Sequence, residues 1–141
     1  MGSNKKIIVL VEDNEQDEHL TIRALQKNNI LNEIVVLRDG EEAIKFFSSP
    51  KFKTEVQVIL LDVKLPKIDG LEVLEHIRKN ENVKHTPVVL LTTSNEESDI
   101  IRGYDLGANS YVRKPVDFDE FANAVKQLGL YWLILNLPPK P

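Results

Sequence analysis

Short runs of apolar residues alternate along this chain with longer segments whose apolar residues recur at helical spacing. The runs are rich in valine, isoleucine and leucine, a composition typical of strands covered on both faces. Strands are predicted at residues 7–11, 33–37, 56–61, 88–91 and 111–112. Helices are predicted at residues 14–27, 41–47, 71–78, 95–106 and 118–128. A strand followed by a helix, five times over, predicts an α/β fold with one parallel sheet and helices on both faces.

Polar residues that can bind a metal ion or take part in a reaction lie where these predicted strands end. Glu12 and Asp13 follow the first strand, Asp62 follows the third, Thr92 follows the fourth, and Lys114 comes just after the fifth. Parallel strands place their carboxyl ends along one edge of the sheet, so these side chains are expected to converge. Clustered carboxylates repel one another unless a cation holds them, and Mg2+ prefers oxygen ligands. A metal site, a nucleophilic carboxylate, a lysine and a hydroxyl are the parts needed to accept a phosphoryl group.

Each acid in this set also has a purely structural explanation. Glu12 and Asp13 would suit the start of the helix expected near residue 14, because acidic residues are favourable at helix N-termini. Asp62 alone would pass for a loop acid, but the turn sequence at 66–70 displays it at the sheet edge. Three carboxylates at equivalent strand ends together favour a metal site.

The hydroxyl and the lysine have alternatives of their own. Thr93 and Ser94 compete with Thr92, but Thr92 directly follows the apolar run and is the one expected to face the phosphoryl group. Lys114 is by default a solvated surface charge. The proline that follows it, Pro115, favours a fixed orientation of the chain at this point.

Composition narrows the class of protein. The 141 residues suffice for one domain, and 42% hydrophobic with 28% charged residues is typical of soluble globular chains. A net charge of -4 gives no reason to expect nucleic acid as a partner, and the absence of cysteine excludes disulfides and thiolate chemistry. The first apolar run is interrupted after five residues, which is too short for a secretory or membrane segment, so we expect a cytoplasmic location.

Four sequence motifs now allow a family resemblance to be stated. The segments VLVEDN, ILLDVKLPKIDG, VVLLTTS and YVRKP, in this order, resemble the receiver domain of two-component response regulators. The resemblance covers residues 6–128. It implies a single domain with the flavodoxin-like, doubly wound (βα)5 fold and strand order 2-1-3-4-5, followed by an apolar C-terminal extension at residues 129–141.

The resemblance also assigns roles to the site. It implies that a sensor histidine kinase passes a phosphoryl group to Asp62 and that Lys114 pairs with the phosphoryl oxygens. Mg2+ would be held by Asp13, Asp62 and the main-chain carbonyl of Lys64, with Glu12 acting through water. On this basis the chain is a phosphoacceptor signalling domain, not an enzyme, although it assists its own phosphorylation and dephosphorylation.

Two further residues fall on the family's switch positions. Thr92 corresponds to the hydroxyl that senses the phosphoryl group and Tyr111 to its coupled aromatic residue. Phosphorylation would then shift a protein-binding surface. Lys64 departs from the commonest pattern, and its side chain is long enough to lie over the phosphoryl site, which would prolong the life of the aspartyl phosphate.

Two other functions suit the same kind of sheet edge. An aspartate-based phosphatase needs a second aspartate two residues after the nucleophile, where this chain has Lys64. A flavodoxin-like cofactor-binding protein needs a loop rich in Ser, Thr and Gly after the first strand, where this chain has Glu12 and Asp13. The sequence disfavours both.

The extension at 129–141 is unusual for a receiver. Seven of the eight residues at 130–137, all but Asn136, are large and apolar. The stretch is too short to span a bilayer, which needs about 20 apolar residues, and too apolar for water. It either packs on its own domain or forms a subunit contact. The tail resembles those of the homodimeric receivers that partner bacterial phytochromes. This resemblance suggests a homodimer and a phytochrome-type kinase. With no effector domain following, we expect another protein to be the downstream partner.

Overall fold

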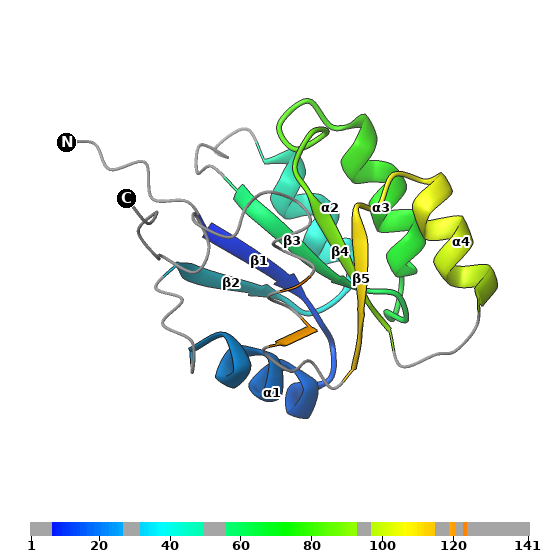
Figure 1. Ribbon diagram of the computed structural model, residues 1–141. Coiled ribbons are helices and arrows are strands. Elements are labelled where there is room, and N and C mark those ends of the chain that lie inside the picture. The colour runs from blue at the N-terminus through cyan, green and yellow to red at the C-terminus, as the bar shows by residue number, and fades with distance from the viewer. Residues whose placement is uncertain are drawn as a thin grey trace, which may run out of the picture.

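The structure, a computed structural model, describes residues 7–26, 32–49, 56–92, 97–114, 119, 120 and 123. Strands and helices alternate within these ranges, as Figure 1 shows. The elements are β1 (Ile7–Val11), α1 (Glu15–Gln26), β2 (Glu33–Leu37), α2 (Gly40–Ser48), β3 (Val56–Asp62), α3 (Gly70–Lys79), β4 (Val88–Thr92), α4 (Glu97–Asp105) and β5 (Ser110–Arg113). None of the described helices is long and apolar enough to cross a lipid bilayer.

The predicted strands are all present, with small shifts at their ends. Asp62 and Thr92 are the last residues of β3 and β4 and do not follow them, because the parallel ladder extends to these positions. Asp62 pairs in register with Leu91, and Thr92 pairs with Arg113. Most of the fifth predicted helix, 118–128, and the whole extension at 129–141 lie outside the described residues.

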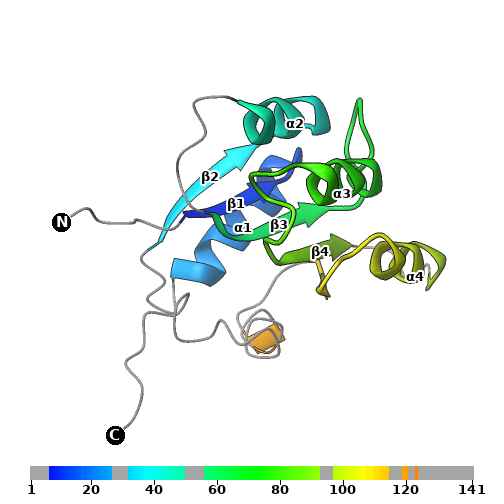
Figure 2. The same cartoon turned by 90° about the horizontal axis from the view of Figure 1, so that it is seen from above.

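The five strands form one parallel sheet in the order β2-β1-β3-β4-β5, which confirms the predicted topology. Figure 2 shows α2, α3 and α4 on one side of this sheet and α1 on the other. The order places β1 and β3 side by side at the centre. The chain segments that leave β1 and β3 therefore start from adjacent points on the same edge of the sheet.

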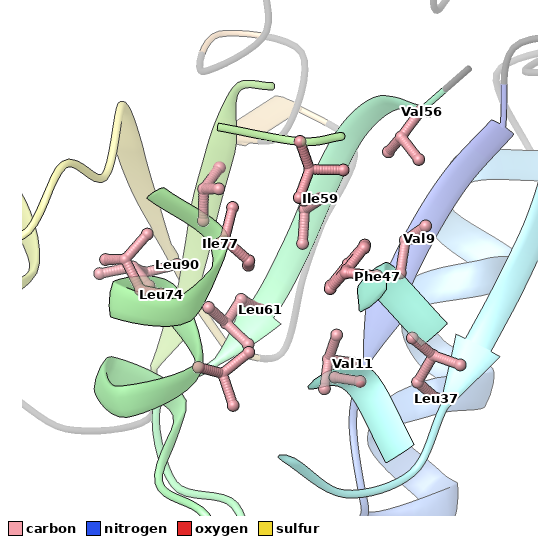
Figure 3. Packing of buried hydrophobic residues seen from close by; sticks show 14 of the residues in the cluster. Val9, Val11, Leu37, Phe47, Val56, Ile59, Leu61, Leu74, Ile77 and Leu90 are labelled. Atoms are coloured by element: carbon pink, nitrogen blue, oxygen red, sulfur yellow. The ribbon is translucent and has the colours of Figure 1, made fainter. Parts of the chain in front are cut away.

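The core fills the space between the sheet and the helices on the α2–α3 side (Figure 3). Every residue of β1 and β3 is buried, which explains why these runs lack polar alternation. The side chains of Phe47, Leu74 and Ile77 pack against this face from α2 and α3. Each fully buried side chain of this size stabilises the fold by about 1.5–3 kcal/mol, so the central strands are firmly held.

The start of α3 lies unusually close to the end of β3. A Cβ atom added at Gly70 would lie 2.1 Å from the carbonyl oxygen of Asp62 and 2.8 Å from the Cα of Val63. The Gly70 N–H donates to the Val63 carbonyl at 3.0 Å, and the Val63 N–H donates to the Leu91 carbonyl at 3.0 Å. Only glycine fits this contact, which fixes the main chain that carries Asp62.

Candidate functional site

Three carboxylates gather at the edge where the central strands end. Oxygen atoms of Glu12, Asp13 and Asp62 all lie within 4.8 Å of one another. Glu12 and Asp62 are buried, with 0% and 3% of their surface exposed, whereas Asp13 is open to solvent. Buried carboxylates at this separation repel strongly, and oxygen-only donor sets of this kind suit a hard divalent cation. The residues present therefore fit the Mg2+ site that the sequence predicts.

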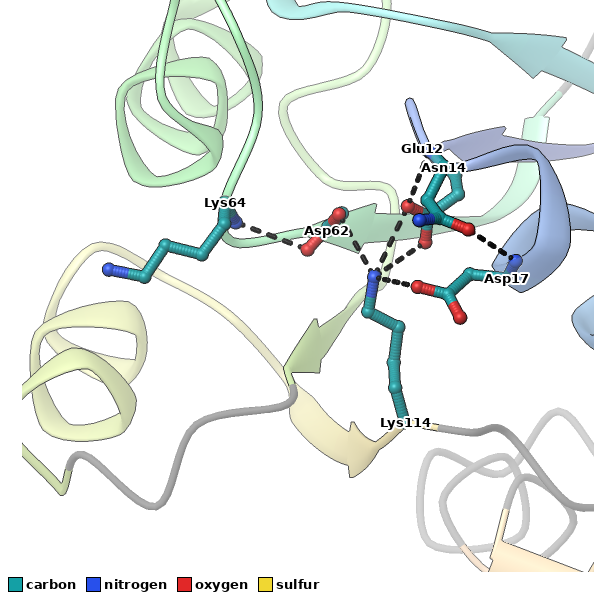
Figure 4. Close-up of polar contacts among 6 residues, drawn as sticks. All are labelled: Glu12, Asn14, Asp17, Asp62, Lys64 and Lys114. Carbon is teal, nitrogen blue, oxygen red and sulfur yellow. Dashed lines mark hydrogen bonds and ion pairs between the residues drawn. The ribbon is translucent and has the colours of Figure 1, made fainter.

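Lys114 reaches into this cluster from the segment after β5 (Figure 4). Its Nζ atom lies 2.9 Å from Glu12 Oε1, 3.2 Å from Glu12 Oε2 and 3.1 Å from Asp62 Oδ2. The side chain of Lys114 is only 6% exposed. A buried ammonium group is stable only when it is paired, so these contacts hold Lys114 over the Asp62 carboxylate.

A third carboxylate also contacts Lys114, and the sequence did not single it out. Asp17, in the first turn of α1, places its Oδ2 atom 2.9 Å from Lys114 Nζ. Asn14 caps this turn, because its Oδ1 atom accepts the Asp17 N–H at 2.9 Å. The cap of α1 is thus Asn14, and neither Glu12 nor Asp13 takes that place. Glu12 Oε2 instead accepts the Asn14 N–H at 3.2 Å.

Burial dominates the electrostatics of the site. Burial, the largest cause, and the nearby Asp62 together raise the pKa of Glu12 from 4.5 to about 7, against the opposing hydrogen bond from Lys114. For Lys114, burial lowers the pKa, but hydrogen bonds to Glu12 and Asp17 and the charge of Asp62 together raise it above the ordinary lysine value. The ammonium group of Lys114 therefore stays charged, and Glu12 is harder to ionise than an ordinary glutamate.

The two predicted switch residues lie on neighbouring strands. Thr92 ends β4 and is 2% exposed, and its carbonyl oxygen accepts the Lys114 N–H at 2.9 Å. Tyr111 lies on β5, is 36% exposed, and meets Tyr104 of α4 edge to face with ring centroids 6.3 Å apart. The ring of Tyr111 thus contacts α4 at the surface. Thr93 and Ser94, the rivals of Thr92, lie outside the described residues.

The side chain of Lys64 is long enough to lie over Asp62 but points elsewhere (Figure 4). Its main-chain N–H donates to Asp62 Oδ1 at 3.1 Å, which helps to orient the Asp62 carboxylate. Its Nζ atom, however, pairs with Asp99 Oδ2 of α4 at 3.6 Å. Figure 4 shows this side chain extending away from the Asp62 carboxylate. In this structure Lys64 therefore links the loop after β3 to α4 through its ion pair with Asp99 and does not cover the Asp62 carboxylate.

Comparisons with known proteins agree with this geometry. A family model described as response regulator receiver domain matches residues 8–126. Response regulator Rcp1 of Synechocystis sp. is 38% identical over 131 residues, which are 91% of this chain and 89% of Rcp1. The Mn(2+)-bound form of Rcp1 superposes with a TM-score of 0.73 at 36% identity, over 96% of this chain and 99% of that one.

Two further solved structures are similar over almost the whole chain. The bacteriophytochrome response regulator AtBRR is 45% identical, with a TM-score of 0.81 over 94% of this chain and 98% of that one. The phosphorylated cyanobacterial phytochrome response regulator RcpA is 39% identical, with a TM-score of 0.75 over 91% of this chain and 94% of that one. The strand order, the acidic cluster with its lysine and these matches lead to one conclusion: this chain belongs to the response regulator receiver domains of two-component signalling.

Proposed function

We propose that this receiver domain accepts a phosphoryl group on Asp62 from a sensor histidine kinase and thereby switches a protein-binding surface. The observation that carries the proposal is the setting of the Asp62 carboxylate. Its Oδ1 atom accepts the Lys64 N–H and its Oδ2 atom accepts Lys114 Nζ, each at 3.1 Å. Glu12 and Asp13 complete the acidic cluster around it.

This setting suits Asp62 to act as a nucleophile. Two donors hold the carboxylate in one orientation, which lowers the entropy cost of reaction. An Asp62 oxygen would form a bond to the phosphorus while the bond between that phosphorus and the kinase histidine nitrogen breaks. The Lys114 ammonium would pair with the phosphoryl oxygens, whose negative charge grows in the transition state.

The proposed cofactor is Mg2+, held by Asp13, Asp62 and the main-chain carbonyl of Lys64, with Glu12 acting through water. When bound, it would neutralise charge on the phosphoryl oxygens. The oxygen-only donor set supports this choice, as does the Mn(2+)-bound form of the relative Rcp1. In the protein without metal, the close carboxylates repel one another and lower the stability of the fold.

The proposed switch uses the two residues that the sequence identifies. The Thr92 hydroxyl would donate a hydrogen bond to a phosphoryl oxygen, and Tyr111 would turn inward, away from Tyr104. The burial of Thr92 beside Lys114 and the present surface position of Tyr111 support this assignment. Phosphorylation would thus favour one of two states of the surface formed by α4 and β5.

The proposed partners follow from the relatives. AtBRR and RcpA are phytochrome response regulators, so a phytochrome-type histidine kinase is the favoured phosphoryl donor. A homodimer formed through residues 129–141 and a separate downstream protein stay proposals, as does the cytoplasmic location. Light scattering of the full chain, compared with a chain that ends at residue 128, tests the dimer. A monomeric mass for the full chain, as for the shortened one, would contradict it.

The phosphoacceptor is tested by treating the protein with acetyl phosphate and Mg2+ and measuring intact mass. Wild type should gain one phosphoryl group and Asp62→Asn should gain none. Asp69→Asn is a matched control, since Asp69 is an exposed loop aspartate that precedes α3 and makes no side-chain cap. Modification of Asp62→Asn to the wild-type extent would disprove the assignment. Turnover of phosphomonoesters or tight flavin binding would instead favour the phosphatase or flavodoxin-like alternatives.

The metal is tested separately by titrating Mg2+ into Asp13→Asn in a calorimeter. Mg2+ affinity should fall because an oxygen ligand is lost. The melting temperature without metal should rise because one repelling carboxylate is gone. Unchanged Mg2+ affinity would show that Asp13 is not a ligand.

A further inference from the structure

The geometry points to Asp17 as a positioning residue that anchors Lys114 at the α1 side of the site, so that the ammonium group leaves the neighbouring carboxylates available to a divalent cation. The inference rests on the cation site of the proposed function and extends it to a residue outside the predicted ligand set. Asp17 acts here through Lys114 and does not contact the reacting atoms.

The first support is the way Lys114 is shared among its partners. Its Nζ atom contacts carboxylates from three different elements: Glu12 after β1, Asp17 in α1 and Asp62 at the end of β3. Glu12 and Asp62 also belong to the group of carboxylates close enough to hold one metal ion, and Asp17 does not. Once a cation occupies this group, held by Asp62 directly and by Glu12 through water, Asp17 is the partner that Lys114 keeps.

The second support is the fixed position of Asp17. Its main-chain N–H donates to the Asn14 cap, which fixes the first turn of α1. In this turn the Asp17 side chain points at Lys114, as Figure 4 shows. The Asp17 side chain is 25% exposed and the Lys114 side chain is 6% exposed. A pair this well shielded is screened less by salt than an exposed one.

The third support comes from charge. A divalent cation beside Glu12 and Asp62 would repel an ammonium group that lies within 3.1 Å of both. Without Asp17, the remaining partners of Lys114 would be these two carboxylates, and Lys114 would compete with the cation for them. With Asp17 present, the ammonium group stays paired with Asp17 while Glu12 and Asp62 become available to the cation.

The experiment is a titration of Mg2+ into the full-length protein by calorimetry, which reads the cation site without any phosphoryl donor. Asp17→Asn should weaken Mg2+ binding about tenfold, the size expected for the loss of one charge-assisted hydrogen bond. Glu15→Gln is the matched control, because Glu15 is an exposed acid in the same helical turn without a Lys114 contact. It should change the affinity by less than about twofold. Asp17→Glu should restore most of the loss.

A double-mutant cycle decides whether Asp17 acts through Lys114 or merely adds negative charge. In a Lys114→Met background, Asp17→Asn should weaken Mg2+ binding by less than about threefold. The same tenfold loss in that background, or a loss no larger than that of Glu15→Gln, would overturn the inference. If Lys114→Met does not fold, failure of Asp17→Glu to restore affinity would overturn it equally.

The outcomes for the wild-type protein separate this inference from the proposed function. Wild type that binds Mg2+ but takes up no phosphoryl group from acetyl phosphate would overturn the proposed function and leave the role of Asp17 to the titrations above. Wild type that binds no Mg2+ at all would overturn both.

Discussion

Replacing Glu12 by glutamine should make the metal-free protein more stable at neutral pH and less sensitive to pH. Glu12 is fully buried, and burial together with the nearby Asp62 carboxylate raises its pKa from 4.5 to about 7. Ionising Glu12 therefore costs more free energy in the folded state than in the unfolded state. Glutamine keeps a similar shape and an acceptor oxygen for Lys114 but carries no charge.

The direction of the stability change with pH follows from the number of protons that the folded and unfolded states bind. Between pH 4.5 and about pH 7 the folded protein keeps the Glu12 proton that the unfolded chain has already released. The folded state then binds more protons, so the stability contributed by this group is complete below pH 4.5 and is lost as the pH rises to about 7. At about 1.4 kcal/mol per pKa unit, the loss is on the order of 3 kcal/mol. That is a large part of the 5–15 kcal/mol by which domains are typically stable.

Urea denaturation followed by circular dichroism, with a chelator present, measures this effect. Between about pH 4.5 and about pH 8, the free energy of unfolding of Glu12→Gln should gain about 3 kcal/mol relative to wild type. Glu75→Gln, at an exposed position in α3, should keep a constant difference from wild type. If Glu12→Gln also keeps a constant difference, the carboxyl group of Glu12 is not held with a raised pKa and the reasoning is wrong.

Two further predictions concern the support of the site. Gly70→Ala should cost about 2 kcal/mol or more in urea denaturation, because its Cβ would meet the Asp62 carbonyl oxygen at 2.1 Å. Gly103→Ala should cost less than Gly70→Ala, since its Cβ would meet Leu90 Cδ1, the end of a side chain, at 2.3 Å and the helix gains about 1 kcal/mol in propensity. Equal costs for both variants would refute the backbone-contact argument. Lys64→Gln should lower stability by less than about 1 kcal/mol, and the difference should vanish in high salt, because the side chain that pairs with Asp99 is 64% exposed. A larger, salt-independent loss would mean that Lys64 is held by contacts beyond this ion pair.

Much of the fold was predictable because its signals are local. Strands buried on both faces need mostly apolar runs, and the runs at 7–11, 56–61 and 88–91 predict three buried strands without any tertiary information. The convergence of Glu12, Asp62 and Lys114 was also predictable, because parallel strands bring their carboxyl ends to one edge whatever the details of packing. The strand order came from the family resemblance, since apolar runs alone do not say which strands are neighbours.

The remaining features depend on how elements pack against one another. Glu15, Asp17 and Glu18 are all acids in the first turn of α1, and only the rotation of this helix against the sheet selects Asp17 as the partner of Lys114. The direction of the Lys64 side chain likewise depends on where α4 places a counter-charge. The spacing of apolar residues predicts which face of a helix or strand is buried. It does not predict which polar side chains, tens of residues apart in the sequence, form a contact.

The same limit applies to the chemistry of the site. The sequence shows that Glu12 is an acid at a strand end, and this predicts an oxygen ligand. It does not show that Glu12 is fully buried beside a second buried carboxylate, which is what raises its pKa to about 7. Nor does it show that Gly70 touches the carbonyl of Asp62. The types of residue and their order along the chain therefore indicate which chemistry is possible, whereas burial and close approach, which arise only when distant segments pack, set the charge and the orientation of each group.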